Sequence, residues 1–452
     1  IFVLVLPALI FFFFFDRTEP APKPQKEATK SSESGIPAET VAVNLHQSEE
    51  FRARETIGYW PNLSGVYFNS TSTETGLQAV DPAQTPCDWS VEIGSGYSTP
   101  VLGLETTFVF YRQGDEEILD CRKLMNGELV WQFRSPTSYA CPVEYSSGPY
   151  STPALSEKYV YALGTEAKLY CIDRQMGELI WIRDLQADYA PEDWDFPVGS
   201  SPLVVEGTVY LNLGGTKGES TIVAIDAESS RTRWTSLSDG RSYASPRLVT
   251  ISGIRHLITL TDRYLSSLDP DTGIIRWQEE FGVKKSPNRV NAVSPLIVDN
   301  QIIVTAGPGA GIACYTIAED GTQKLAWSDP RHLDSQFSNI TCLSDTIFGF
   351  TSKWNRQAEL RRLSRQTGEI EWSWNSVLMR GSLAVADGKL FLLGEEGHFA
   401  ILDISRSEPI VLVQPEQPVL KGPCYSSPVI GGGYLVLRNE EVMKAWNLRG
   451  GK

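Results

Sequence analysis

Histidine is scarce in this chain of 452 residues, which has four: His46, His256, His332 and His398. They are scattered along the chain, so they offer neither the ligand spacing of a zinc site nor the histidine of a plausible catalytic triad. Gly307-Pro-Gly-Ala-Gly311 lacks the lysine and the following helix of a phosphate-binding loop. The sequence therefore predicts no catalytic, cofactor-binding or metal-binding residue.

A complete disulfide framework is also missing, because the chain has seven cysteines and no C-x-x-C pair. Cys121 and Cys171 each lie ten residues before a tryptophan, where Ala224 stands in another repeat, so we expect both to be small core residues. Cys141 and Cys424 fall in loops that enter inner strands, and a bridge between these two is the alternative that the sequence leaves open.

Positive charge is in deficit. The formal net charge is −15, which argues against nucleic acid and against anionic membrane surfaces as partners. A hydrophobic content of 41% over this length is enough to bury a large core.

A short motif built on Ser-Pro recurs along the chain, with prolines at positions 100, 153, 202, 246 and 295. The spacing of 44 to 53 residues is typical of stacked repeats. Weaker copies lie near Ile340 and Leu383, and a good copy ends at Pro428. Proline suits the first residue of a strand, where its missing N–H breaks no ladder bond. We therefore predict that an inner strand begins at each of these places.

A second motif places a glycine four residues before a tryptophan. It occurs as Gly127/Trp131, Gly177/Trp181, Gly273/Trp277 and Gly368/Trp372. Glycine supplies the positive φ of a tight hairpin, and the indole brings a large flat surface to the gap between neighbouring sheets. We interpret these tryptophans as packing residues between sheets rather than as functional residues.

The fold predicted from these motifs is all-β, an eight-bladed propeller of four-stranded antiparallel blades. The last unit, Pro428 to Asn447, has only three strands, and Cys87 to Ile93 precedes the first inner strand and carries Trp89. We expect this N-terminal strand to complete the last blade, because the pairing removes both open edges.

Lys168-Leu-Tyr-Cys-Ile-Asp173 with Gly177-Glu-Leu-Ile-Trp181 resembles the repeat of pyrroloquinoline-quinone (PQQ)-like propellers, as does Ile222-Val-Ala-Ile-Asp226 with Trp234. The resemblance covers about residues 57–450. The family includes quinoprotein dehydrogenases, a non-enzymatic propeller subunit of the outer-membrane β-barrel assembly machinery, and exported bacterial proteins. The resemblance therefore implies the fold without deciding between an enzyme and a scaffold.

The quinoprotein alternative implies PQQ with calcium, carboxylate and amide ligands, an aspartate base and two adjacent cysteines. No two cysteines of this chain are adjacent. Asp269-Pro-Asp-Thr-Gly273 has the composition of an ion-binding loop, but it occupies the hairpin position that Asp173 to Gly177 fills in another repeat. We interpret it as a turn.

The N-terminal part of the chain differs from the repeats. Residues 1–15 are an apolar run that includes Phe11 to Phe15, and the chain begins with Ile rather than Met, so we expect the natural start to precede it. A signal anchor in the inner membrane is the first interpretation and an uncleaved export signal the second. Residues 16–56, rich in Pro, Lys, Glu and Ser, predict a flexible tether, and residues 57–450 the propeller.

The candidate partner-binding residues interrupt the repeat on one face of the propeller: Trp194, Lys284, Lys285, Arg289 and Trp354. The two tryptophans lie outside the packing register. They either cover the mouth of the channel or anchor a protein partner, since Trp and Arg dominate interface energetics. The function that we predict is a non-enzymatic, membrane-tethered, periplasmic scaffold that binds proteins and takes no cofactor. The alternative is a PQQ-dependent redox enzyme or a ligand-binding propeller.

Overall fold

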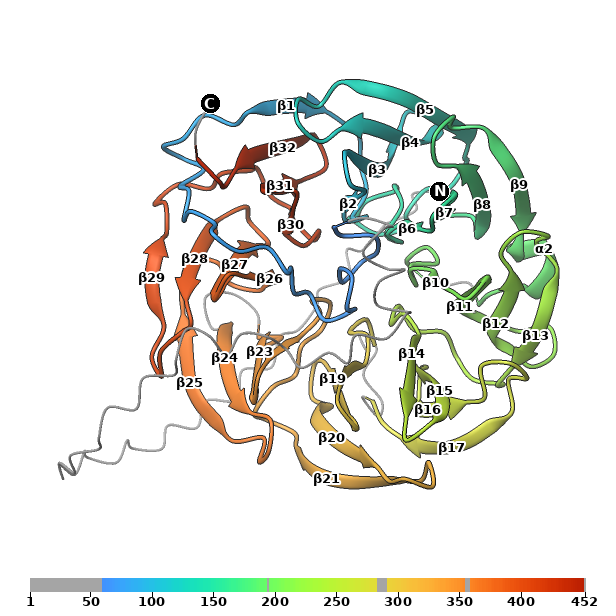
Figure 1. Ribbon diagram of the computed structural model, residues 1–452. Coiled ribbons are helices and arrows are strands. Elements are labelled where there is room, and N and C mark those ends of the chain that lie inside the picture. Colours follow the sequence, from blue (N-terminus) through green and yellow to red (C-terminus); the bar gives the residue numbers. More distant parts are fainter. Residues whose placement is uncertain (1–58, 193–194, 283–290, 354–357, 451–452) are drawn as a thin grey trace, which may run out of the picture. The chain divides into compact units, whose positions relative to one another are not determined.

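The computed structural model describes residues 59–192, 195–282, 291–353 and 358–450. In these residues, 32 strands form eight four-stranded antiparallel sheets, which are arranged as blades around an axis (Figure 1). The predicted all-β, eight-bladed propeller is confirmed.

Each blade of the first half of the ring is a meander of consecutive strands. Blade 1 contains β2 (Val101–Leu102), β3 (Thr106–Gln113), β4 (Glu116–Lys123) and β5 (Leu129–Pro136). Blade 2 contains β6 (Ala154–Leu155), β7 (Tyr159–Leu163), β8 (Lys168–Asp173) and β9 (Leu179–Asp184). Blade 3 contains β10 (Leu203–Val205), β11 (Thr208–Gly215), β12 (Ser220–Asp226) and β13 (Thr232–Ser236). Blade 4 contains β14 (Arg247–Ile251), β15 (Ile254–Leu260), β16 (Tyr264–Leu268) and β17 (Ile275–Glu280).

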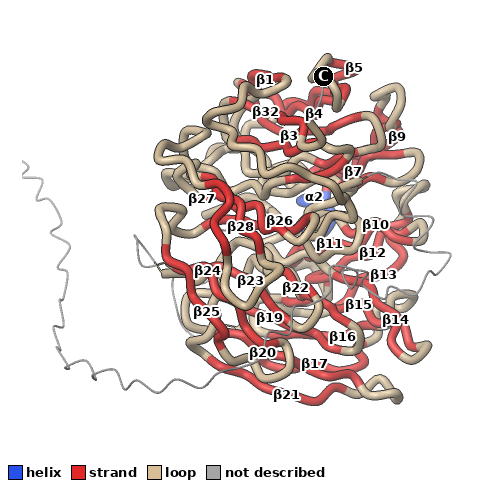
Figure 2. The backbone as a smooth tube through the Cα atoms, turned by 60° about the vertical axis from the view of Figure 1, so that its left-hand side comes forward, coloured by secondary structure: helices blue, strands red, loops and turns tan. Residues whose placement is uncertain are grey.

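The second half repeats this pattern. Blade 5 contains β18 (Leu296–Val298), β19 (Gln301–Ala306), β20 (Gly311–Ile317) and β21 (Gln323–Asp329). Blade 6 contains β22 (Thr341–Leu343), β23 (Thr346–Phe350), β24 (Glu359–Ser364) and β25 (Ile370–Asn375). Blade 7 contains β26 (Gly381–Ala386), β27 (Lys389–Gly394), β28 (Phe399–Asp403) and β29 (Ile410–Val413). The short helix α2 (Leu185–Tyr189) lies between blades 2 and 3 (Figure 2).

Blade 8 closes the ring. It contains β30 (Val429–Gly431), β31 (Tyr434–Arg438) and β32 (Val442–Asn447), and its outer strand is β1 (Trp89–Glu92) from the other end of the propeller. The two ends pair antiparallel with Trp89 opposite Ala445, which confirms the predicted closure. Arg438, fully buried, holds blade 8 to blade 1 by donating to the carbonyls of Ser98, Phe110, Gly94 and Gly96.

The tryptophan of one blade lies against the glycine turn of the next. A methyl group on Gly177 would lie 2.6 Å from the indole of Trp131, and Gly127, Gly273 and Gly368 meet Trp89, Trp234 and Trp327 in the same way. The Trp131 Nε1 also donates to the carbonyl of Arg174 in that turn, at 3.1 Å. The predicted packing role is therefore confirmed, and the glycine and tryptophan of one motif contact opposite neighbours.

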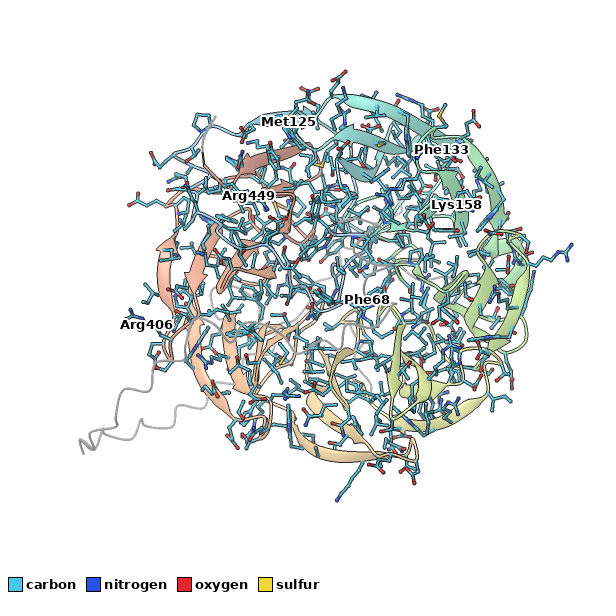
Figure 3. All side chains as sticks on the ribbon, in the orientation of Figure 1. Phe68, Met125, Phe133, Lys158, Arg406 and Arg449 are labelled. Carbon is cyan, nitrogen blue, oxygen red and sulfur yellow. The ribbon has the colours of Figure 1, made fainter. Side chains whose placement is uncertain are left out.

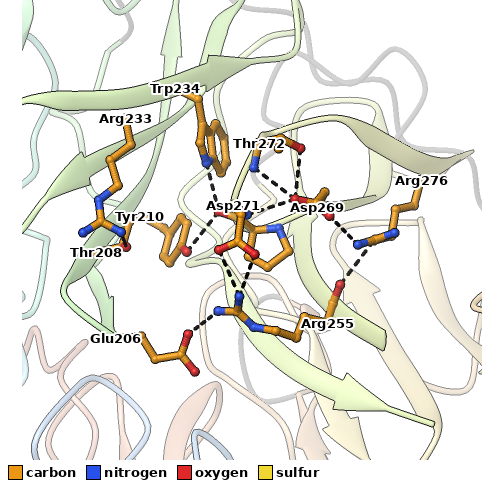
Figure 4. Close-up of polar contacts among 11 residues, drawn as sticks. Glu206, Thr208, Tyr210, Arg233, Trp234, Arg255, Asp269, Asp271, Thr272 and Arg276 are labelled. Carbon is orange, nitrogen blue, oxygen red and sulfur yellow. Dashed lines mark hydrogen bonds and ion pairs between the residues drawn. The ribbon is translucent and has the colours of Figure 1, made fainter. Parts of the chain in front are cut away.

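Figure 4 shows this contact between blades 3 and 4, where Trp234 Nε1 and the Tyr210 hydroxyl both donate to the carbonyl of Pro270. Opposite the tryptophans stand small residues of the third strands, including Cys121 and Cys171, each followed by a β-bulge. Both cysteines are buried, as expected of small core residues.

The propeller has two faces. The loop face carries the connections between blades and the turns between second and third strands. The turn face carries the other two turns of each blade. The lead-in, residues 59–80, crosses the turn face: Trp60 bridges to Leu102 and is fully buried. Phe68 lies near the middle of the ring (Figure 3). The lead-in therefore occupies the turn face near the axis, and the loop face is the side on which a site can open.

Among the described residues, no helix is long and apolar enough to cross a membrane. Residues 1–58 lie outside them, so the anchor and the tether stay predictions.

Candidate partner-binding face

The five predicted partner-binding residues, Trp194, Lys284, Lys285, Arg289 and Trp354, all lie outside the described residues. Their segments, 193–194, 283–290 and 354–357, fall in connections between blades or between second and third strands. Those connections belong to the loop face by topology. The prediction that these side chains share one surface stays a prediction.

The described part of the loop face carries a cluster of seven aromatic rings around the axis of the propeller, here called the aromatic mouth. Its members all come from loops that enter inner strands: Tyr97, Tyr145, Tyr150, Phe196, Tyr243, Phe337 and Tyr425. Most are half-buried, and Tyr145 is 40% exposed. The mouth thus offers aromatic surface from blades on opposite sides of the axis.

Contacts between neighbouring rings connect six members of the mouth one after another in space. The centroids of Phe337 and Tyr425 are 4.9 Å apart, and those of Tyr425 and Tyr97 are also 4.9 Å apart. Tyr97 lies 4.7 Å from Tyr150, and Phe196 lies 6.2 Å from Tyr150 and 6.5 Å from Tyr243. These separations are those of favourable aromatic pairs. The rings therefore support each other across the loop face.

Four tyrosine hydroxyls of the mouth, those of Tyr97, Tyr150, Tyr243 and Tyr425, stay protonated at neutral pH. Burial raises the pKa of Tyr243 to about 12. Burial likewise raises the pKa values of Tyr97, Tyr150 and Tyr425 above the ordinary value of tyrosine. These four side chains consequently present neutral rings with hydroxyl groups rather than anions.

Two buried arginines border the aromatic mouth. Arg380 pairs with the buried carboxylate of Glu395, with Nη2 2.5 Å from Oε2, and stacks on the ring of Phe337 at 4.9 Å. Arg241 donates to the carbonyl of Phe196 at 2.6 Å and lies 5.7 Å from the ring of Tyr243. Each guanidinium fixes an aromatic side chain, so the mouth is held in place before any partner arrives.

Below the mouth, a chain of hydrogen bonds joins successive inner strands. The backbone N–H of Thr99 donates to the Thr152 hydroxyl, and the N–H of Thr152 donates to the hydroxyl of Ser201. The same bond joins the pairs Ser201/Ser245, Ser245/Ser294, Ser294/Asn339 and Ser427/Thr99. The Ser-Pro motif therefore has a second role, because its hydroxyl or amide accepts from the preceding blade.

In the described part of the chain, no group of three or more His, Cys, Asp or Glu side chains could hold a metal ion. In the loop after β16, Asp269 accepts from the backbone N–H groups of Asp271 and Thr272 and pairs with Arg276, and Asp271 pairs with Arg255 (Figure 4). This loop is a turn, as predicted.

The seven cysteines are all free thiols. Cys141 Sγ lies 3.4 Å from the carbonyl of Asp195, and Cys424 Sγ lies 3.5 Å from the carbonyl of Lys421. The bridge between Cys141 and Cys424, left open by the sequence, is absent from the structure.

Sequence reasoning missed the aromatic mouth, although a signal for it exists. A tyrosine stands three residues before the proline, or its equivalent, of several motifs: Tyr97, Tyr150, Tyr243 and Tyr425. This position lies close to the axis of the propeller. A tyrosine that recurs there therefore indicates a cluster of aromatic rings around the axis on the loop face. Phe196 and Phe337 carry no such regularity.

The fold defines the class of the protein, an eight-bladed PQQ-like propeller. Comparison with solved structures agrees. BamB from Moraxella catarrhalis matches with a TM-score of 0.57 and 16% identity over 79% of this chain and 98% of that chain. A europium-containing methanol dehydrogenase matches with a TM-score of 0.64 and 11% identity over 86% of this chain and 91% of that one. At these identities the matches show the fold alone.

Within this class, the chain belongs to the family described as outer membrane protein assembly factor BamB, whose model matches residues 115–374. A curated relative, outer membrane protein assembly factor BamB of Moranella endobia, is 26% identical over 265 residues, or 57% of this chain. The match spans 61% of that relative, less than two thirds of its length.

Proposed function

We propose that this protein is a non-enzymatic propeller that acts as a protein-interaction scaffold in envelope assembly, outside the cytoplasm, held at the inner membrane by its N-terminal segment. The observation that carries the proposal is the family match over residues 115–374, because the family description names an assembly factor of the outer membrane. The matched relative bears the same name.

The aromatic mouth supports a role in protein binding. Tyr, Phe and Arg are enriched at protein interfaces, and rigid aromatic rings lose little entropy on binding. Tyr145, 40% exposed and within 5.2 Å of Phe196, is the most accessible member. The loops that carry Trp194, Arg289 and Trp354 belong to the same face by topology, so the proposed partner would meet aromatic and basic side chains together.

The experiment that tests the proposal is chemical cross-linking of the full chain in intact cells, followed by mass spectrometry. We expect envelope-assembly proteins among the cross-linked partners. The double variant Trp194→Ala/Trp354→Ala should weaken the recovery of those partners while the circular dichroism spectrum and the melting temperature stay unchanged. Unchanged recovery by the folded double variant would remove these two residues from the proposed interface.

A second test examines the alternative, that the protein is a PQQ-dependent redox enzyme. The purified protein is incubated with PQQ and calcium, and dye-linked alcohol oxidation and the visible absorbance of bound quinone are measured. We expect neither signal above that of a protein-free control. A stoichiometric chromophore with alcohol oxidation would replace the scaffold proposal by the enzymatic one.

A further inference from the structure

Most interfaces between blades are joined by polar contacts of two kinds. One is the tryptophan Nε1 that donates to a carbonyl in the next blade, as Trp181 donates to Ala227 at 3.1 Å between blades 2 and 3. The other is the chain of N–H to hydroxyl bonds near the axis, as between Thr152 and Ser201. Between blades 6 and 7, Arg362 donates to the carbonyl of Arg406 instead.

The interface between blades 7 and 8 has neither kind of contact in the described residues. Val413 takes the tryptophan position, opposite Ile401 and next to the β-bulge. The chain of bonds near the axis stops at Asn339 and resumes at Ser427. Apart from the loop that joins the two blades, no described hydrogen bond or ion pair runs directly between their sheets. Only apolar packing connects them there.

A segment of the lead-in, residues 70–78, bridges this interface on the turn face and is here called the strap. On blade 7, the Val385 N–H donates to the Ser70 carbonyl, the Ser72 N–H donates to the Val385 carbonyl, and the Leu77 N–H donates to the Asp387 carboxylate. The first two bonds measure 2.8 Å and the third 2.9 Å. The strap therefore adds a parallel partner to the inner strand β26.

On blade 8, the strap is held mainly by Glu74, whose side chain is buried. One carboxylate oxygen accepts from the N–H of Gly432 at 2.8 Å, and the other accepts from the N–H of Gly433 at 3.1 Å and pairs with Arg449 at 2.6 Å. The Gln78 N–H donates to the carbonyl of Leu448 at 2.7 Å. The same nine-residue segment thus binds both blades.

The loop face of this interface is incompletely filled. A groove of about 590 Å³ lies between the turns of blades 7 and 8, lined by Glu396, Leu420, Lys421, Asn439, Glu441 and Val442. This groove lies among surface turns, whereas the sheets of the two blades share one buried apolar cluster that includes Ile401, Val413 and Val436.

We propose that the strap is a releasable clasp and that the ring opens between blades 7 and 8 when the strap leaves. The two sheets have no direct polar contact with each other in the described residues, and besides the joining loop, which is hydrogen-bonded to both blades, their bridge is the strap. A pull on the chain before residue 59, or a partner that binds residues 70–78, would act on this interface first. Opening would separate the apolar faces of blades 7 and 8 without unfolding the other blades.

Hydrogen–deuterium exchange of the full-length protein, read by mass spectrometry, tests the clasp. Glu74→Gln leaves one acceptor oxygen, turns an amide N–H toward a backbone N–H, and removes the charge that pairs with Arg449. We expect amides of β26 to β32 to exchange about tenfold faster or more in this variant, since hydrogen bonds to charged groups are worth at least that factor. Exchange in blades 2 to 4 should stay unchanged.

The matched control is Glu117→Gln between blades 1 and 2. Glu117 is buried, and a single oxygen, Oε1, accepts from both the N–H and the hydroxyl of Thr165, so glutamine can replace it. We expect exchange within about twofold of the unaltered protein. Equal acceleration around the whole ring in Glu74→Gln, or none in blades 7 and 8, would overturn the proposal.

If Glu74→Gln does not fold, exchange of the unaltered protein in low concentrations of urea decides the question. The proposal requires blades 7 and 8 to lose protection at a lower urea concentration than blades 1 to 3. Simultaneous loss around the ring, or earlier loss in blades 1 to 3, contradicts it.

Discussion

The two faces of the propeller are held by different kinds of contact. On the turn face the lead-in is held by backbone hydrogen bonds and by buried side chains such as Trp60, and the glycine turns receive the tryptophans of their neighbours. On the loop face half-buried rings such as Tyr97 and Tyr425 contact each other and remain accessible in part. We infer that the lead-in and the glycine turns give the turn face a mainly structural role and that the aromatic mouth leaves the loop face free for recognition.

This comparison predicts that substitutions on the turn face reduce stability and that substitutions on the loop face reduce binding. The largest effect is expected for Trp60→Ala. Trp60 is fully buried, and its loss leaves a cavity between the lead-in and the inner strand β2, so the free energy of unfolding should fall by about 4 kcal/mol. Urea denaturation monitored by fluorescence measures this change in the free energy of unfolding.

The control for Trp60→Ala is Tyr145→Ala on the loop face, where the side chain is 40% exposed. This substitution should reduce the free energy of unfolding by no more than about 1 kcal/mol. Equal losses of stability in the two variants would remove the distinction between the faces.

A smaller effect is expected at the glycine turns. Gly177→Ala should reduce the free energy of unfolding by about 3 kcal/mol, since a φ of +73° disfavours alanine and the added methyl group meets Trp131 at 2.6 Å. Gly218→Ala, on the loop face, has nearly the same φ of +72° with no atom within 4 Å, so it should cost about 1 kcal/mol. The difference between the two melting curves measures the tryptophan contact, and a difference near zero would mean that this contact contributes nothing.

The smallest effect concerns pH. Burial raises the pKa of Tyr97 in the folded protein above its ordinary value near 10. The folded state then holds the phenol proton more tightly than the unfolded state, so this contribution to stability is complete below about pH 10 and is lost as the pH rises further.

Tyr97→Phe removes one such group and should make the alkaline fall of the unfolding free energy shallower by up to about 1.4 kcal/mol per pH unit. Phe337→Leu, which removes a ring that does not titrate, should leave the slope unchanged. The measurement is urea denaturation between pH 8 and pH 11.5, and identical slopes for Tyr97→Phe and the unaltered protein would contradict the prediction.

Much of the fold could be predicted because it repeats. The Ser-Pro motif marks the inner strands, and Trp89 before the first of them indicates where the missing outer strand comes from. Both features are local, since a turn or a strand start needs only a few neighbouring residues. The fixed spacing of ten residues before a tryptophan also predicted that Cys121 and Cys171 are core residues, and both are buried.

The contacts of the lead-in could not be predicted in the same way, because they join residues that are far apart in the sequence. The Glu74 carboxylate accepts hydrogen bonds from Gly432 and Gly433 and pairs with Arg449. Arg438 donates hydrogen bonds to carbonyls of blade 1. No spacing in the sequence indicates such pairs. The aromatic mouth lies between these cases, because its tyrosines recur in register but their mutual contacts arise only when the ring closes.

Site-specific photo-cross-linking in cells can show whether the loop face receives a protein partner. A photoreactive phenylalanine analogue is placed at Tyr145 on the loop face or at Met125 on the turn face, where the side chain is 69% exposed. We expect envelope-assembly proteins to be captured at position 145 and not at position 125. Capture at position 125 alone, or equally at both positions, would contradict it.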